Sequence, residues 1–147
     1  MTTLLDTNVV IALTKPTDLF HAWAVAQLET AKTNDPPAAI CDVSFAEASV
    51  AYKNADELRT VLAELGIDRI PTTDEALYVA GQTFFAYRKD KSQPTRDGVL
   101  PDFIIGAVAQ VEAVPLMTAN SKDFVKRYAG LTLIEPPPHP APALVTP

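Results

Sequence analysis

Short hydrophobic runs alternate with longer amphipathic segments along the chain, and this pattern predicts an α/β fold. Runs of about four apolar residues bounded by Pro, Gly, Asn or Asp are typical of buried strands. They occupy residues 3–5, 38–41, 67–70, 115–118 and 131–134. Apolar positions at helical spacing fall at about residues 19–28, 44–52, 56–65, 74–88, 101–111 and 120–127. Strands separated by helices imply a parallel sheet with helices on both faces.

Residues with known capping preferences mark several of the predicted helix boundaries. Thr17 can cap the first amphipathic helix, Thr73 precedes the helix at 74–88, and Gly66 ends the helix before that one. The segment that begins at Pro101 is apolar around most of its circumference, as expected of a helix buried in the body of the domain. The charged segment 89–98 is predicted to be an exposed loop.

The length and the distribution of proline indicate one domain followed by a tail. A chain of 147 residues can bury about two thirds of its unfolded surface in a single core. Six of the 13 prolines lie between residues 136 and 147, so this segment is predicted to be extended or disordered. We therefore expect a domain at residues 1–135 and a Pro-rich tail at 136–147.

Composition excludes several classes of protein. No stretch approaches the roughly 20 apolar residues of a membrane span, and the N-terminus lacks the basic and apolar regions of a secretory signal, so we expect a cytoplasmic protein. One cysteine and two histidines are too few for a zinc site. The net charge of −6 weighs against binding nucleic acid by bulk electrostatics. Seven of the 12 basic residues nevertheless fall in residues 88–127, which leaves room for a local basic rim.

Three acidic residues stand where chemistry is expected in such a fold. Asp6 follows the first strand, and ligands of parallel α/β sheets collect beyond the carboxyl ends of strands. Each acid also has a purely structural explanation. Asp6 and Asn8 can make turn or cap hydrogen bonds, Ser44-x-x-Glu47 has the pattern of a capping box, and Asp102 in the first turn of a helix is favoured by the helix dipole.

The surroundings of these acids favour a metal ion over the structural explanations. Asp102 has little water to face in a helix that is apolar nearly all round, and an unpaired buried carboxylate costs several kcal/mol. No Lys or Arg lies within four residues of Asp6, Glu47 or Asp102. A hard divalent cation such as Mg²⁺ or Mn²⁺, held by carboxylates and water, would compensate all three acids. Such an ion lowers the pKa of a bound water and prepares it to attack a phosphodiester.

Four sequence segments resemble the PIN-domain nucleases, and most closely the VapC-like ribonuclease toxins of toxin–antitoxin pairs. The segments are Leu4-Leu5-Asp6-Thr7-Asn8, Ser44-x-x-Glu47, Pro101-Asp102-Phe-Ile-Ile-Gly-Ala-x-Ala109 and Leu116-Met-Thr118-x-Asn120-x-x-Asp123-Phe124. The resemblance implies a three-layer α/β/α sandwich with a five-stranded parallel sheet. It also implies Mg²⁺- or Mn²⁺-dependent cleavage of RNA, with Asp6, Glu47 and Asp102 as metal-site and catalytic residues and with Asn8 and Thr118 supporting them. A cognate antitoxin and a homodimer are the protein partners that it implies.

The chain departs from the family pattern at one position. Where the family often has a fourth acid, this chain has Asn120, which brings no negative charge, and occupancy of a second metal is therefore open. Asp123 could replace that acid, or could be the third residue of a helix capped by Asn120. The alternative function is a PIN-like binding or scaffold module that no longer cleaves RNA. A phosphoaspartyl enzyme is disfavoured because a phosphatase of that kind needs a second Asp where Asn8 stands.

Overall fold

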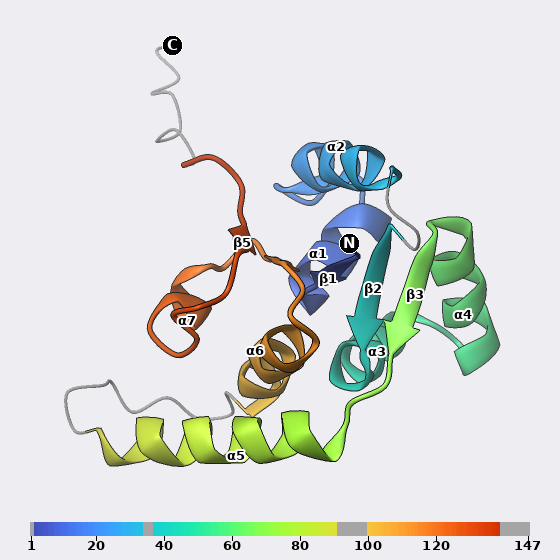
Figure 1. The fold of residues 1–147 in the computed structure, drawn as a ribbon. Helices are drawn as coiled ribbons and strands as arrows, with labels where there is room; N and C mark the ends of the chain where they lie inside the picture. Colours follow the sequence, from blue (N-terminus) through green and yellow to red (C-terminus); the bar gives the residue numbers. More distant parts are fainter. Residues whose placement is uncertain (1, 34–36, 91–99, 139–147) are drawn as a thin grey trace, which may run out of the picture.

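A computed structural model describes residues 2–33, 37–90 and 100–138 (Figure 1). The strands are β1 (Thr3–Leu5), β2 (Ala38–Cys41), β3 (Ile67–Ile70), β4 (Leu116–Met117) and β5 (Leu133–Ile134). The helices are α1 (Thr7–Thr14), α2 (His21–Ala31), α3 (Asp42–Ala48), α4 (Ala55–Glu64), α5 (Asp74–Lys89), α6 (Leu100–Glu112) and α7 (Lys122–Val125), with a 3₁₀ turn at Ser49–Ala51. The predicted alternation of strands and helices is confirmed, but α1 was not among the predicted helices.

All five strands form one parallel sheet in the order β3-β2-β1-β4-β5. The central strand β1 pairs with β2 on one side and with β4 on the other, so the residues after these strands meet at the same edge. From β1 the chain adds β2 and β3 on one side of the sheet and then β4 and β5 on the other. Open α/β sheets bind ligands at the strand where the direction changes in this way. Because Asp6 directly follows β1, the order of the strands in the sheet places it where a binding site is expected.

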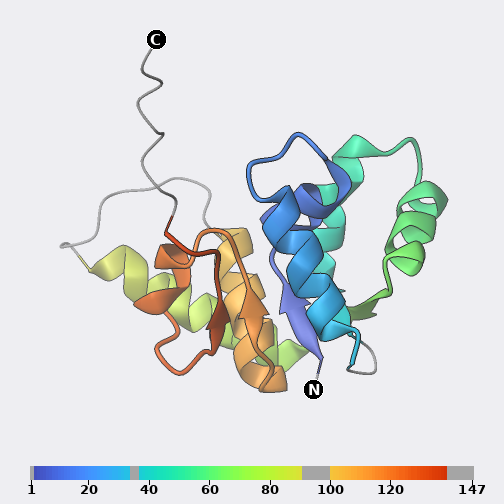
Figure 2. The same cartoon turned by 90° about the horizontal axis from the view of Figure 1, so that it is seen from above.

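Alternating side chains of the strands divide the core into two layers. Leu5 faces a cluster built with α1, α2 and α4, whereas its neighbour Leu4 faces a cluster built with α6, α7 and α5. Figure 2 shows these two groups of helices on opposite sides of the sheet. Helix α3 contacts both α1 and α6. The expected three-layer α/β/α sandwich is confirmed.

Close packing between α6 and the segment after α7 depends on one glycine. The Tyr128 ring lies against Gly106 in the middle of α6, and a Cβ atom at this position would overlap the ring. The Tyr128 hydroxyl donates to the backbone carbonyl of Phe103 at 2.7 Å. The absence of a side chain at Gly106 therefore allows the segment after α7, which carries Tyr128, to pack closely against α6.

Several predicted boundaries are wrong by a few residues. Thr17 is not the cap of α2, which begins at His21 with Phe20 as N-cap. Asp18 instead accepts a hydrogen bond from the Phe20 backbone N–H and shapes the turn before the helix. The last helix is shorter than predicted. Most of the predicted loop at 89–98 and most of the Pro-rich tail lie outside the described residues.

No helix among the described residues is long and apolar enough to cross a membrane.

Candidate metal centre

Asp6 is the centre of a hydrogen-bond network at the carboxyl edge of the sheet. It caps α1, and its Oδ1 accepts from the Thr7 backbone N–H at 2.7 Å. Its Oδ2 accepts from the Thr118 hydroxyl at 2.8 Å and from the Asn8 side-chain amide at 3.2 Å. Asp6 is 4% exposed, and Thr118 is fully buried. Three donors therefore fix both oxygens of a carboxylate that has almost no contact with bulk water.

Asn8 and Thr118 also bind the loop that follows β4. The side-chain oxygen of Asn8 accepts from the Ala119 backbone N–H at 3.2 Å. The Thr118 hydroxyl oxygen accepts from the Asn120 backbone N–H at 2.9 Å. The Asn8 bond joins the start of α1, just after β1, to the loop after β4, although the two segments are more than 100 residues apart in the chain. The Thr118 bond lies within that loop.

Glu47 approaches the site through Thr7. The Thr7 hydroxyl donates to Oε1 of Glu47 at 2.7 Å and lies 3.0 Å from the hydroxyl oxygen of Ser44. The capping-box interpretation of Ser44 and Glu47 is wrong, because α3 begins at Asp42 with Cys41 as its N-cap. Ser44 is therefore inside the helix, fully buried, and turned toward α1.

Buried polarity is concentrated at this edge of the sheet. Five polar or charged residues are buried among those that the structure describes, and four of them belong to the network around Asp6. These four are Asp6, Thr7, Ser44 and Thr118. A buried polar group is costly unless it is paired, so this concentration marks a built site rather than scattered turn hydrogen bonds.

Burial and neighbouring carboxylates raise the pKa of Asp6. Desolvation is the largest cause and brings the pKa from 3.8 to about 6, although the hydrogen bonds from Thr118 and Thr7 oppose it. The negative charges of Asp102 and Glu47 add to the increase. Electrostatic coupling of this kind requires the three predicted acids to lie near one another, because such interactions weaken with distance and screening.

Asp102 lies in the first turn of α6 with a second group of charges around it. Desolvation raises its pKa most, the charges of Asp123 and Glu47 raise it further, and the Arg127 guanidinium opposes them. Asn120 donates its side-chain amide to Asp123. Asn120 is not the cap of α7, because Ser121 occupies that position, so the capping interpretation of Asn120 is wrong.

Arg127 is held over aromatic rings beside Asp102. Its guanidinium lies 4.4 Å from the centre of the Phe103 ring and 4.7 Å from that of Tyr87. One of its terminal nitrogens is buried without a hydrogen-bond partner. Arg127 is one of the basic residues predicted to form a rim. Its guanidinium, however, stacks on aromatic rings of the core instead of projecting into solvent. Two others of that set, Lys91 and Arg96, lie outside the described residues.

The donor set fits a hard divalent cation that keeps part of its hydration shell. In the described part of the chain, no three His, Cys, Asp or Glu side chains are close enough to enclose a metal by themselves. Mg²⁺ commonly binds through one or two carboxylates with water completing the octahedron, so such an enclosure is not required. The ligand atoms here are all oxygens, and salt bridges among the described residues do not involve Asp6, Glu47 or Asp102.

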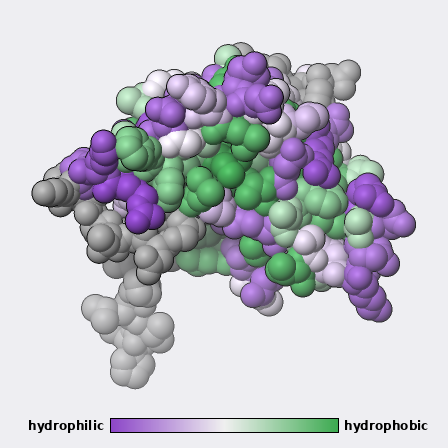
Figure 3. All heavy atoms as spheres, turned by 90° about the horizontal axis from the view of Figure 1, so that it is seen from below, coloured by the Kyte–Doolittle hydropathy of each residue, from purple (hydrophilic) through white to green (hydrophobic). Residues whose placement is uncertain are grey.

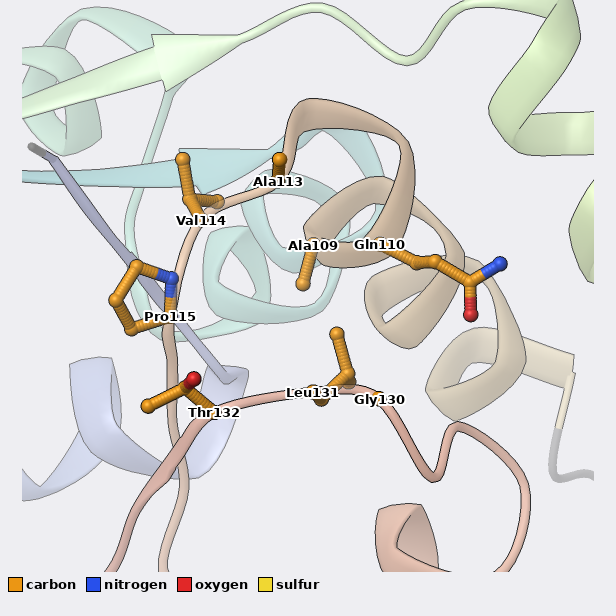
Figure 4. Close-up of a pocket in the computed structure, with 8 residues that line it drawn as sticks. All are labelled: Ala109, Gln110, Ala113, Val114, Pro115, Gly130, Leu131 and Thr132. Carbon is orange, nitrogen blue, oxygen red and sulfur yellow. The ribbon is translucent and has the colours of Figure 1, made fainter.

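A pocket of about 350 Å³ lies at the other edge of the sheet (Figure 4). Residues from the end of α6 and from the segments entering β4 and β5 line it: Ala109, Gln110, Ala113, Val114, Pro115, Gly130, Leu131 and Thr132. None of these residues can serve as an acidic metal ligand or as a general base. The pocket is therefore separate from the site around Asp6.

Two residues of the site were not singled out by the sequence reasoning. Thr7 connects Asp6 to Glu47, and Arg127 lies beside Asp102. A hydroxyl residue directly after a strand-end acid was a usable signal for Thr7. Arg127 offered none, because only the fold brings the segment after α7 against α6.

Comparisons with known proteins agree with the observed fold. The sequence profile of the PIN domain matches residues 3–131. A search of curated proteins found no match. Among solved structures, VapBC2 from Rickettsia felis bound to a promoter DNA fragment has a TM-score of 0.67 at 21% identity, covering 92% of this chain and 98% of that chain.

Two further structures show the same likeness. A toxin–antitoxin complex from Klebsiella pneumoniae has a TM-score of 0.59 at 26% identity, covering 90% of this chain and 95% of that chain. VapC20 from Mycobacterium tuberculosis, a toxin that cleaves the sarcin–ricin loop, has a TM-score of 0.61 at 15% identity, covering 91% of this chain and 99% of that chain. With the profile spanning most of its length, the chain belongs to the PIN domain family.

Proposed function

We propose that the protein is a Mg²⁺- or Mn²⁺-dependent endoribonuclease and the toxin of a toxin–antitoxin pair. The observation that carries this proposal is the network around Asp6, in which four buried polar side chains and two further acids gather at one edge of a PIN fold. A scaffold protein would have no reason to bear the cost of an ionised carboxylate that burial and two like charges disfavour.

Asp6, Glu47 and Asp102 are the residues that would hold the metal. Hydrogen bonds from Thr7, Asn8 and Thr118 fix the two oxygens of Asp6, so this ligand is oriented before the metal arrives. Thr7 also orients Glu47. A metal bound there would supply an activated water and neutralise the negative charge that develops on the phosphoryl oxygens.

Asn120 and Asp123 belong to the same proposal as candidates for a second metal position. The charge of Asp123 acts on Asp102, and the Asn120 amide donates to the Asp123 carboxylate. We therefore favour Asp123 as the acid that compensates for Asn120, which brings no charge of its own.

RNA cleavage with the purified protein tests the proposal. The expected result is cleavage of total RNA with Mn²⁺ or Mg²⁺, none with EDTA, and a loss of at least about 100-fold in Asp6→Asn. Asp68→Asn, at an exposed position on β3, is a matched control that should retain activity. Metal-independent cleavage, or equal cleavage by both variants, would reject the assignment. Absence of cleavage together with absence of metal binding would favour the scaffold alternative.

The proposed partners are an antitoxin, a second copy of the chain and an RNA substrate, in the cytoplasm. Structures that share the fold are toxin–antitoxin complexes, which supports a search for the antitoxin in the neighbouring open reading frame. Expression of the protein alone should arrest growth, and co-expression of that frame should relieve the arrest. Arrest that persists during co-expression would argue against this partner.

A further inference from the structure

Arg127 is a positive charge held in a fixed place beside the acids of the candidate metal centre. It follows α7 and stacks on Phe103, the residue next to Asp102 in the first turn of α6, with its guanidinium 4.4 Å from the ring centre. The Tyr87 ring of α5 lies 4.7 Å from the same guanidinium. Two aromatic rings from different helices therefore orient this cation before any ligand arrives.

The contacts that hold Arg127 leave hydrogen-bond donors unused. A guanidinium carries five N–H donors, and stacking on a ring face needs none of them. One terminal nitrogen of Arg127 is buried with no hydrogen-bond partner in the described part of the chain, although buried polar groups are normally paired. The residue as a whole is half-buried, so the side chain is not sealed inside the core. An anion bound at Arg127 would supply acceptors that the free protein lacks.

Arg127 acts on a metal-site acid without forming an ion pair with it. Its charge lowers the pKa of Asp102, and no other described basic residue does so. No salt bridge within the described ranges includes Asp102 or Arg127. An arginine whose role were to neutralise Asp102 would form the parallel hydrogen bonds of an Arg–carboxylate pair. Arg127 is therefore close enough to share a ligand with the metal centre and is still available to bind one.

The end of α5 next to Arg127 is also basic. Arg88 and Lys89 directly follow Tyr87 and are both exposed. Figure 3 views the molecule from the side of α5, and hydrophilic residues gather at its left, where that helix ends. A polyanion that approaches Arg127 along this end of α5 therefore meets positive charge, although the net charge of the chain is −6.

We propose that Arg127 contacts the substrate and binds a phosphate group of the RNA chain beside the metal centre. The inference rests on the nuclease activity proposed above and names a residue outside the set of acids. A planar guanidinium matches two oxygens of a phosphate group, and a phosphate bound there lies next to Asp102. The three acids repel a phosphodiester, so a cation that contacts the same phosphate offsets part of that repulsion.

RNA binding by the non-cleaving Asp6→Asn protein tests the contact. The probe is a short fluorescein-labelled single-stranded RNA, and fluorescence anisotropy gives its dissociation constant at several salt concentrations. Arg127→Met keeps an apolar side chain of similar length over the two rings. It should raise the dissociation constant at least about tenfold and reduce the salt slope by about 0.7, as expected for the loss of one phosphate contact on a single strand.

Arg59→Met is the matched control, because it removes the same charge from an exposed position on α4. It should change the RNA dissociation constant less than about threefold, because charges farther away than the Debye length are screened. Arg127→Lys keeps the charge but lacks the planar fork. It should keep the salt slope and recover only part of the affinity. If Arg127→Met does not fold, weaker binding at an unchanged salt slope in Arg127→Lys carries the test.

Calorimetric titration with Mn²⁺, in chains that retain Asp6, distinguishes a substrate contact from a structural role. Loss of a positive charge beside Asp102 should leave Mn²⁺ binding by Arg127→Met as tight as in the wild type, or tighter. A residue that only positions Asp102 would weaken Mn²⁺ binding when it is replaced. Much weaker Mn²⁺ binding by Arg127→Met would therefore overturn the inference.

The RNA measurements separate failure of this inference from failure of the nuclease proposal. Equal effects of Arg127→Met and Arg59→Met on RNA binding would overturn the role of Arg127 and leave the nuclease proposal standing. Absence of both RNA binding and RNA cleavage in chains that retain Arg127 would overturn the two together.

Discussion

Replacing Asp6 by Asn should increase the stability of the metal-free protein at neutral pH. Burial and the charges of Asp102 and Glu47 raise the pKa of Asp6 from 3.8 to about 6 in the folded protein. Because one pKa unit corresponds to about 1.4 kcal/mol, the ionised carboxylate costs the folded state about 3 kcal/mol above pH 6. An uncharged Asn of nearly the same shape avoids that cost.

The hydrogen bonds of Asp6 reduce the expected gain. Asn offers one acceptor oxygen where Asp6 accepts from Thr7 on one oxygen and from Asn8 and Thr118 on the other. Loss of acceptors for buried donors costs about 1–2 kcal/mol. The free energy of unfolding of Asp6→Asn should therefore exceed that of the wild type by about 1–2 kcal/mol near pH 7.5 in EDTA.

The pH dependence of stability provides a second test of whether ionised Asp6 destabilises the folded protein. Asp6 ionises in the unfolded chain near pH 3.8 but in the folded protein only near pH 6. Its contribution to stability is therefore fully present below pH 3.8 and is lost as the pH rises through 6. Below this window the variant keeps only the hydrogen-bond penalty and should be less stable than the wild type.

Urea denaturation across this pH range measures both predictions. The difference between Asp6→Asn and wild type should change sign between about pH 4 and pH 7, whereas the exposed control Asp68→Asn should show no such crossover. Saturating Mn²⁺ should stabilise the wild type and not Asp6→Asn, because only the intact site binds the ion. A variant that is less stable at every pH, or a difference that does not vary with pH, would mean that burial and neighbouring charges do not raise the pKa of Asp6.

Three further substitutions test local features of the fold and the site. Gly106→Ala should lower the free energy of unfolding by at least about 1–3 kcal/mol in urea denaturation, because the new methyl group overlaps the Tyr128 ring. Ala113→Gly should raise the same quantity by about 0.5–1 kcal/mol, because Ala113 has a positive φ of 54° at the end of α6. Thr7→Val should raise the Mn²⁺ dissociation constant in calorimetric titration about 10- to 100-fold, because Glu47 loses its 2.7 Å hydrogen bond; an unchanged constant would mean that Thr7 has no part in orienting Glu47.

Much of the fold follows from the sequence because local patterns and global packing agree. The run at Leu4 and Leu5 is buried on both faces of the sheet, and such runs indicate a central parallel strand. Gly66 has a φ of 72° after α4, as its position in the sequence predicted. Helix boundaries were less predictable where a side chain forms hydrogen bonds with nearby backbone groups. Asp18 does so before α2, where it accepts from the Phe20 backbone N–H.

The candidate site was predictable in its acids but not in its connections. Asp6, Glu47 and Asp102 could be chosen because each lacks a nearby cation in the sequence. Its place directly after Asp6 could have marked Thr7 as a candidate, but its role in orienting Glu47 could not be predicted, because that role depends on a contact across 40 residues. Ser44 had a reasonable local explanation as a cap, and only the start of α3 at Asp42 removes it. The roles of Thr7 and Ser44 therefore depend on tertiary contacts that the local sequence pattern does not reveal.

Anomalous diffraction from crystals soaked in Mn²⁺ is the most direct test of the metal centre. One strong peak is expected in contact with a carboxylate oxygen of Asp6, with Glu47 and Asp102 reaching the ion directly or through water. The peak should disappear in Asp6→Asn crystals. Mn²⁺ bound only elsewhere, or an Asp6 carboxylate that contacts no ion at saturating Mn²⁺, would contradict the claim that these acids form a metal-dependent active site.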